Sequence, residues 1–290
     1  MTSSSGQAPP RWEACGRTIV AGRVPRVMGI VNATPDSFSD GGRAATTDAA
    51  VAHAFALVAE GADLLDIGGE SSRPGADPVG LDEELRRVVP VIEAIVPRVN
   101  VPISVDTTKA AVARRAIEAG AVIINDITAL SGDPDLADVV AETGAGVVLM
   151  HMRGTPRTMQ DDPRYDDVVA EVYDFLARRI EWAESRGIPR SRIAIDPGIG
   201  FGKDFEHNLE LLRNLERFAT LECALVIGVS RKGFLGNLTG RSVTERAAAS
   251  VAASLAAALK GADVVRVHDV AAMADTIKVW TALYGWDETR

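Results

Sequence analysis

Cysteine is scarce in this chain of 290 residues, which contains only Cys15 and Cys223. Two such distant cysteines provide neither the spacing of a zinc site nor the framework of a disulfide-rich secreted domain. The opening segment MTSSSGQAPPR lacks the apolar core of a secretory signal, and its Ser, Gly and Pro content is typical of disorder. We therefore expect a cytoplasmic protein with a disordered leader over residues 1–12.

Basic charge and long apolar runs are also lacking. The chain has 31 Lys and Arg against 40 Asp and Glu, which gives a formal net charge of −9. An acidic balance argues against nucleic acid or an anionic membrane as partner. No apolar run approaches the roughly 20 residues that a membrane helix needs. Any anion must therefore be bound locally, by a few well-placed cations.

The chain is rich in one repeated pattern: a helical stretch, a glycine, a short aliphatic run and then polar residues. It is clearest in EGADLLDIGGE (60–70), EAGAVIINDI (118–127), ETGAGVVLMH (142–151) and KGADVVRVHD (260–269). The glycines suit the position at which a chain leaves a helix. The aliphatic runs are too continuous for half-exposed strands, and they are typical of parallel strands covered on both faces. Further strands are expected in RVMGIVN, VPISVD, RIAIDPG and ALVIGVS.

Helical patterns alternate with these strands. We expect helices over 48–60, 81–96, 109–119, 134–142, 166–185, 205–218, 244–260 and 270–284. About eight strand–helix units predict an α/β fold, a (β/α)₈ TIM barrel, with a doubly wound open sheet as the alternative. The unit count favours the barrel, as does the absence of a dinucleotide fingerprint after the first strand. We expect one domain over 13–290, with a small hairpin near 13–24.

Polar residues end nearly every expected strand. A single acidic residue in such a place is usually a helix cap. In a barrel, however, the carboxyl ends of all strands meet at one mouth, where the active site lies. The strand-end residues are Asn32, Asp66, Glu70, Asp106, Asn125, Asp126, His151, Asp196, Ser230, Lys232, Arg266 and His268.

One group among these residues offers hydrogen-bond acceptors. Asp106, Asn125 and Asp196 supply carboxylate and amide oxygens, and Asn125 adds amide donors. Such a set matches the N–H edge of an aminopyrimidine or guanidine-like heterocycle in a dry pocket. The acceptor set therefore predicts a heterocycle site.

The other group is cationic. Lys232, Arg266 and His268 follow the last two strands, where barrels often bind phosphate, and arginine can hold phosphate through two parallel hydrogen bonds. We therefore predict that Arg266 and His268 face an anion at the barrel mouth. The alternative is that Arg266 pairs with a buried acid such as Asp269 or Asp66.

Two loops at the expected mouth are unusually long. NATPDSFSDGGRAATT (32–47) follows the first strand and GGESSRPGADPVG (68–80) follows the second. Both exceed the usual length of such loops, which makes them candidate lids over the active site. The alternative is that they are surface loops that tolerate extra length and have no role at the site.

These same segments resemble a known family. MGIVNATPDSFSDGG (28–42) and DIGGESSRPGA (66–76) closely resemble the two signature segments of the dihydropteroate synthase family. SVDTTK, IIND, LMHMRG, DPGIGFGK, GVSRKGFLG and RVHDV extend the match in the same order, over roughly residues 24–280. Many members have Thr in place of Ser72, and Gly233 is smaller than is usual at its position, which leaves the detailed shape of the aminobenzoate pocket open.

The resemblance implies a transferase of folate biosynthesis. Such an enzyme condenses 6-hydroxymethyl-7,8-dihydropterin pyrophosphate with p-aminobenzoate in an SN1-like displacement, releasing pyrophosphate and 7,8-dihydropteroate. It also implies Mg²⁺ as cofactor, a homodimer and competition by sulfonamides, although sensitivity or resistance stays open. The alternatives are a methyltetrahydrofolate–corrinoid methyltransferase-like barrel, which has no need of the cation set, and a non-catalytic pterin-binding paralogue.

The resemblance assigns roles by position. The implied pterin ligands are Asp106, Asn125, Met150, Asp196, Phe201 and Lys232. The implied diphosphate ligands are Arg73, Arg266 and His268, and the p-aminobenzoate contacts are Ser72, Pro74 and Ser230. Asn32 is implied in Mg²⁺ binding, and Asp36, Arg73 and Lys232 in catalysis, with Asp36 on a loop that folds over the site.

Overall fold

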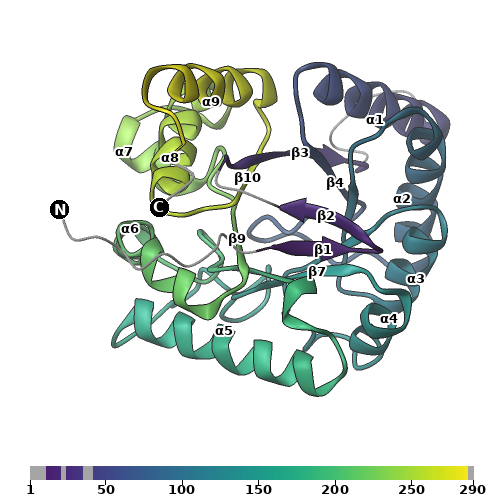
Figure 1. Ribbon diagram of the computed structural model, residues 1–290, viewed down its shortest axis with the longest axis horizontal. Helices are drawn as coiled ribbons and strands as arrows, with labels where there is room; N and C mark the ends of the chain where they lie inside the picture. The colour runs from purple at the N-terminus through teal and green to yellow at the C-terminus, as the bar shows by residue number, and fades with distance from the viewer. Residues whose placement is uncertain (1–10, 21–23, 35–41, 287–290) are drawn as a thin grey trace.

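A closed barrel of parallel strands forms the centre of the molecule (Figure 1). This computed structural model describes residues 11–20, 24–34 and 42–286, of which 42–46 are described by backbone only. The barrel strands follow one another in sequence order and close where β10 pairs with β3, with Val264 opposite Arg26. They are β3 (Arg26–Asn32), β4 (Leu64–Gly68), β5 (Ile103–Asp106), β6 (Ile123–Asp126), β7 (Gly146–Met150), β8 (Ile193–Asp196), β9 (Ala224–Ile227) and β10 (Val264–Val267).

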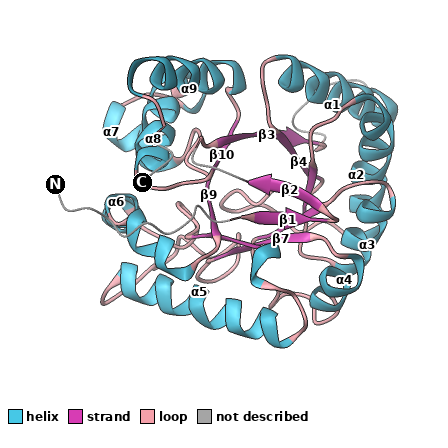
Figure 2. Ribbon diagram, viewed as in Figure 1, coloured by secondary structure: helices cyan, strands magenta, loops and turns pink. Residues whose placement is uncertain are grey.

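Helices surround the barrel as an outer ring (Figure 2). They are α1 (Gly42–Ala59), α2 (Leu81–Ile95), α3 (Ala110–Glu118), α4 (Leu136–Thr143), α5 (Val168–Ser185), α6 (Phe205–Arg213), α7 (Gly233–Thr239), α8 (Ala247–Leu259) and α9 (Val270–Tyr284). The predicted (β/α)₈ barrel is confirmed, and closure of the sheet excludes the open alternative. Among the helices described, none combines the length and apolar character needed to cross a membrane.

An apolar stripe fixes each helix on the barrel. In α2, Val88, Val91, Ile92 and Ile95 recur at helical spacing, and none of the four is exposed to solvent. Full burial of an aliphatic side chain stabilises a fold by about 1.5–3 kcal/mol. The layer between barrel and helices is therefore the main hydrophobic core.

The barrel interior is apolar near the amino-terminal ends of the strands, and a hairpin closes the barrel at that end. Strands β1 (Trp12–Ala14) and β2 (Arg17–Val20) pair antiparallel, and Figure 1 shows them lying across the centre of the helical ring. Trp12 is fully buried, and its Nε1 donates a hydrogen bond to the carbonyl of Arg192 at 3.1 Å. The packed residues are Trp12, Ala14, Ile19, Val20, Met28, Leu64, Val122, Ile123, Val148, Ala194, Ala224, Val226 and Val264.

The expected hairpin is thus present, with two differences in extent. It begins at Trp12, inside the segment assigned to the leader, and ends at Val20. Residues 1–10 lie outside the described residues. The strand can begin directly after the polar segment MTSSSGQAPPR because the Trp12 ring packs into the apolar end of the barrel, which we call the floor.

Two helical regions differ from the expectation. The helix expected over 205–218 ends at Arg213, and a 3₁₀ turn, Leu215–Leu221, follows it. Helix α7 was not predicted, because it has only seven residues and contains Gly233 and Gly236. It begins directly after Lys232 and therefore fixes where that side chain leaves the barrel.

Candidate active site

The barrel interior is polar near the carboxyl ends of the strands. The strand register sets Asp106 of β5 beside Gly68 of β4 on one side and Asn125 of β6 on the other. Alternate residues of a strand face the same side, so Asp66, which is paired with Ser104 and lies two residues before Gly68, faces the same interior as Asp106. The sheet thus brings acidic and amide groups from neighbouring strands to one place.

Arg266 of β10 joins this acidic layer. Its Nε donates to Asp66 Oδ2 at 2.6 Å, and its Nη2 donates to Asp106 Oδ2 at 3.1 Å. The same Asp66 oxygen accepts a hydrogen bond from Asn125 Nδ2 at 3.0 Å. A single network therefore joins Arg266 of the cation set to Asp66 and to two members of the acceptor set, Asp106 and Asn125.

The ion pair considered as an alternative for Arg266 is thus present, with Asp66 as its partner. Asp269 instead pairs with Arg231, through contacts of 2.6 and 3.2 Å. A guanidinium has five N–H groups, and the two bonds of Arg266 use two of them. The pairing orients Arg266 at the mouth, and it leaves donors that an anion can use.

Burial raises the pKa of both strand-end aspartates of the acceptor set. The pKa of Asp106 rises to about 7, chiefly because of burial and then because of the charge of Asp66, with Arg266 acting in the opposite direction. The pKa of Asp196 rises to about 6 through burial, although its Oδ1 accepts a 2.7 Å hydrogen bond from the amide of Gly198. Both carboxyls are therefore charged near neutral pH only at a free-energy cost.

Lys232 stands over an aromatic face. Its Nζ lies 3.9 Å from the centre of the Phe201 ring, and burial, followed by the charge of Arg266, lowers its pKa to about 8. Phe201 packs with Met150 and Met159 in a small apolar cluster. A cation and an apolar wall thus adjoin the acidic layer, as a flat heterocycle requires.

His268 is hydrogen-bonded to Ser230, in surroundings that disfavour a charged ring. Its Nδ1 lies 3.0 Å from Ser230 Oγ, which also accepts from the His268 amide at 3.2 Å. Burial, with the charge of Arg266 next, lowers the pKa of His268 to about 4. These surroundings favour the neutral ring in the ligand-free site, and the assignment of His268 to the diphosphate stays a prediction.

Arg231 fixes the two loops that carry Ser230 and His268. It has a positive φ of 58°, an unusual conformation for a residue with a side chain. Its backbone N–H donates to Ser250 Oγ at 2.8 Å, and its guanidinium binds Asp269. Arg231 thus joins the loop after β9 to the loop after β10.

The loop after β4 carries three further candidates. Ser72 is half-buried, whereas Arg73 and Pro74 are exposed. The amide of Gly75 donates to the carbonyl of Pro156 at 3.0 Å, which ties this loop to the one after β7. The charge of Arg73 is among those that lower the pKa of His268, so these two diphosphate candidates lie close enough to interact.

The first long loop is described only in part. Asn32 ends β3, is half-buried and stands opposite Gly68 of β4. Asp36 lies outside the described residues, as does the rest of 35–41. The geometry therefore bears on Asn32 and leaves the role of Asp36 as a prediction.

Three features of the site are not among the predicted ligands. Asp66 is fully buried in the network. Lys203, also buried, donates to the carbonyl of Phe201 at 2.9 Å, and its Nζ lies 2.9 Å from His151 Nδ1. Lys109 Nζ bridges Glu70 and Glu84 at 2.5 Å each, at the base of the loop after β4.

Only the first of these had a signal in the sequence. Asp66 is an acid inside an aliphatic run, a feature that marks a functional strand. Lys203 and Lys109 appear in the sequence as ordinary loop lysines. The burial of Lys203 and the two ion pairs of Lys109 are visible only in three dimensions.

Known proteins show the same arrangement. The model of the pterin binding enzyme family matches residues 28–268. The dihydropteroate synthase of Escherichia coli (strain K12) is 46% identical over 266 residues, 92% of this chain and 94% of that protein.

Two solved structures of Xanthomonas albilineans dihydropteroate synthase are also similar. The one with 4-aminobenzoic acid is 54% identical, with a TM-score of 0.88 over 95% of this chain and 98% of that one. The one in complex with 7,8-dihydropteroate is 50% identical, with a TM-score of 0.85 over 94% and 98%. Motifs, barrel and mouth agree with these matches, and the chain belongs to the dihydropteroate synthase family.

Proposed function

We propose that this protein is a dihydropteroate synthase. It condenses 6-hydroxymethyl-7,8-dihydropterin pyrophosphate with p-aminobenzoate and releases pyrophosphate. Besides family membership, the observation that carries the proposal is the contact between Arg266 and Asp106. This contact joins the acceptor set, which would bind the heterocycle, to the cation set, which would bind the diphosphate.

The acceptor set binds and stabilises the pterin. The ring N–H groups donate to Asp106, Asn125 and Asp196, while Phe201 and Met150 form an apolar wall. The bond between the pterin methylene carbon and the diphosphate oxygen breaks, and its electron pair leaves with the diphosphate. The positive charge left on the dihydropterin is stabilised by the nearby carboxylates, which are fixed before the reaction begins.

The cation set binds the departing diphosphate. Arg266 and Lys232 supply positive charge within the mouth, Arg73 approaches from the exposed loop, and His268 contributes ring hydrogen bonds. These groups stabilise negative charge that grows as the bond breaks. They therefore lower the free energy of the transition state of the reaction more than that of the bound substrate.

The second substrate enters from the loop side. We assign its contacts to Ser72, Pro74 and Ser230, the last of which is already hydrogen-bonded to His268. The amine lone pair attacks the methylene carbon, and the proton released passes to solvent or to the diphosphate. An aromatic amine needs no strong base, which agrees with the lowered pKa of His268, because a ring with a low pKa is a weak base.

We propose that Mg²⁺ accompanies the diphosphate and that Asn32 is its ligand from the protein. Among the described residues, no group of three or more His, Cys, Asp or Glu side chains is placed to hold a metal. Mg²⁺ beside substrate phosphates keeps waters and uses few protein ligands. Asn32 would therefore hold the ion together with phosphate oxygens, and the ion when bound would neutralise charge on the leaving group.

Product formation tests the proposal. Purified protein supplied with both substrates and Mg²⁺ is expected to release pyrophosphate and to form dihydropteroate in equal amounts. Asp106→Ala, which removes an acceptor of the ring, is expected to abolish both. Tight binding of the pterin diphosphate without any pyrophosphate release would contradict the proposal and support a non-catalytic pterin-binding protein.

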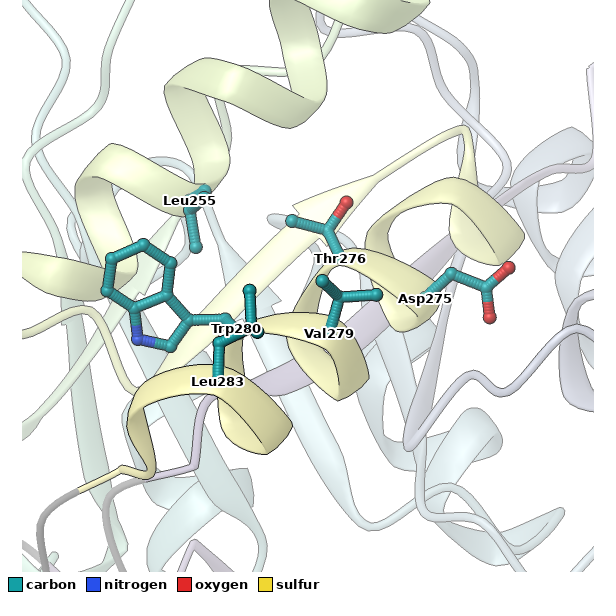
Figure 3. A pocket seen from close by; sticks show the side chains of 6 residues that line it. All are labelled: Leu255, Asp275, Thr276, Val279, Trp280 and Leu283. Carbon is teal, nitrogen blue, oxygen red and sulfur yellow. The ribbon is translucent and has the colours of Figure 1, made fainter.

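We also propose a cytoplasmic homodimer, formed through the outer face of α9. A groove of about 300 Å³ between α8 and α9, remote from the strand ends, is lined by Leu255, Asp275, Thr276, Val279, Trp280 and Leu283 (Figure 3). Val279, Leu283 and Tyr284 are 59%, 67% and 70% exposed. A second copy of the chain would cover this apolar face. Leu283→Lys is expected to shift the sedimenting species from dimer to monomer, and an unchanged dimer would contradict this interface.

A further inference from the structure

The buried acid in the middle of β4 carries the inference. Asp66 has no exposed surface, and its Oδ2 accepts both the 2.6 Å bond from Arg266 and the 3.0 Å bond from Asn125. These two side chains come from β10 and β6, on opposite sides of β4. Asp66 thus contacts one member of the acceptor set and one member of the cation set through the same oxygen.

We propose that Asp66 is a positioning residue, which orients the Asn125 amide for the pterin and the Arg266 guanidinium for the diphosphate. This inference rests on the proposed function and deepens it. Asp66 itself need not touch either substrate.

The first consequence concerns the amide of Asn125. An asparagine side chain has a donor end and an acceptor end of similar shape, and only its partners decide which end points where. Asp66 is a carboxylate in this network, so the Nδ2 end of Asn125 faces it. The oxygen of Asn125 is then free to accept an N–H of the ring.

The second consequence concerns the plane of the guanidinium. Asp66 holds Nε of Arg266, and Asp106 holds Nη2. Two carboxylates on two edges fix the orientation of a planar fork. Without Asp66, only Asp106 would orient the Arg266 guanidinium. Its remaining N–H donors would then no longer point in a fixed direction toward the anion.

An acid that served only the fold would be expected to satisfy both of its oxygens. In the described structure, Asp66 Oδ1 is buried without a hydrogen-bond partner, as is Ser104 Oγ at the paired position of β5. A buried acceptor without a partner costs about 1–3 kcal/mol. The fold tolerates this cost at the centre of the site, which agrees with a functional placement.

Removing the charge of Asp66 also has an electrostatic consequence. Asp106 faces the negative charges of Asp66, Glu84 and Asp126 and the positive charge of Arg266. Lys232 is close enough for its pKa to be influenced by Asp106 as well. After burial, Asp66 is the largest cause of the raised pKa of Asp106, so Asp66→Asn must lower that pKa.

The experiment compares Asp66→Asn with Asp63→Asn. Asp63 precedes the same strand at the opposite end of the barrel, where it binds the amide of Val27 at 2.9 Å. Calorimetry measures the affinity of each protein for 6-hydroxymethyl-7,8-dihydropterin and for its diphosphate, between pH 5.5 and 9. At pH 8 we expect Asp66→Asn to lose about 10- to 100-fold affinity for the diphosphate, and Asp63→Asn to change it less than about threefold.

The pH profile separates positioning from loss of folding. Affinity of the wild type is expected to fall below about pH 7, as Asp106 takes up a proton. In Asp66→Asn the affinity is expected to fall at a lower pH than in the wild type. At pH values above this fall, the variant still binds more weakly than the wild type. Equal losses in the two variants, or an unmoved profile, would overturn the proposal.

Nuclear magnetic resonance of the ligand-free protein gives a readout that does not depend on the proposed function. The Arg266 Nε–H is expected to exchange slowly in the wild type and in Asp63→Asn, and faster in Asp66→Asn, with a shifted Asn125 side-chain amide signal. Unchanged signals would overturn the positioning role, even if the wild type proved to bind no pterin. If Asp66→Asn fails to fold, Asp66→Ser is measured in the same way.

Discussion

At the scale of single residues, the site keeps acidic groups where water cannot stabilise them. Asp106 and Asp196 both have a raised pKa because they are buried, and Lys232 has a lowered one for the same reason. Each ionised form is less stable in the folded protein than in the unfolded chain. If the substrates bind as proposed, they supply the missing partners, and stability and function oppose each other at this site.

Replacement of Asp196 tests this opposition. The folded-state pKa of about 6 lies above the ordinary value of 3.8, so the folded protein binds this proton more tightly than the unfolded chain does. Ionisation therefore destabilises the wild type increasingly from about pH 4 to pH 6, and the penalty is fully present above that range. Asp196→Asn is expected to raise the free energy of unfolding at pH 8 by about 1–3 kcal/mol, while pterin affinity falls at least about tenfold.

Urea unfolding of wild type and Asp196→Asn at pH 8 and at pH 4.5 measures the difference. The gain in stability is expected to shrink at the lower pH, because the wild-type carboxyl is then protonated. A variant that is less stable than the wild type by the same amount at both pH values would contradict the electrostatic account.

The sequence predicts single residues well where a strand end marks them. Asp106, Asn125 and Arg266 are predicted from their positions and do meet at one mouth. The sequence offers Asp66 only as an alternative partner of Arg266, and its bond to Asn125 is not predicted, because Asp66 bonds residues 59 and 200 positions away. The lowered pKa of His268 is also hidden, since it follows from burial and from neighbouring cations that only the folded chain supplies.

At the scale of elements, periodicity predicts the strands and the long helices. It fails at α7, where Gly233 and Gly236 suppress the helical pattern. The two glycines differ in their surroundings. A Cβ at Gly233 would meet no atom within 4 Å, whereas one at Gly236 would collide with the guanidinium of Arg246. That guanidinium also donates to the carbonyls of Arg231 and Lys232, so Gly236 helps to hold the site.

Alanine at these two positions is expected to act in opposite directions. Gly233→Ala should raise the free energy of unfolding by about 0.5–1 kcal/mol, because alanine loses less backbone entropy on folding. Gly236→Ala should lower it by about 1–3 kcal/mol, because Arg246 must move. Thermal unfolding of both variants checks this. Equal effects at the two positions would show that the Arg246 contact is unimportant.

At the scale of the whole molecule, the hairpin closes the barrel end opposite the carboxyl ends of the strands. Trp12 lies in the apolar floor, and the charged residues lie in the opposite half. The sequence predicts a hairpin but not its place, because nothing local in WEACGRTIV indicates contact with residues more than a hundred positions away. We therefore expect the floor to support the fold and the mouth to carry the chemistry.

Trp12→Ala tests this division. We expect it to lower the free energy of unfolding by about 3–5 kcal/mol, with KM values for both substrates unchanged in the fraction that remains folded. Trp182→Ala, which removes a half-buried tryptophan from α5, should be less damaging. A large change in KM with Trp12→Ala would mean that the floor is coupled to the mouth.

One measurement tests the central claim most directly: a crystal structure of the protein with 6-hydroxymethyl-7,8-dihydropterin pyrophosphate and Mg²⁺. The account predicts the ring against Asp106, Asn125 and Asp196, with the diphosphate at Arg266 and His268 in the same cavity. A ring or a diphosphate bound elsewhere, or a mouth too narrow to hold both, would contradict it.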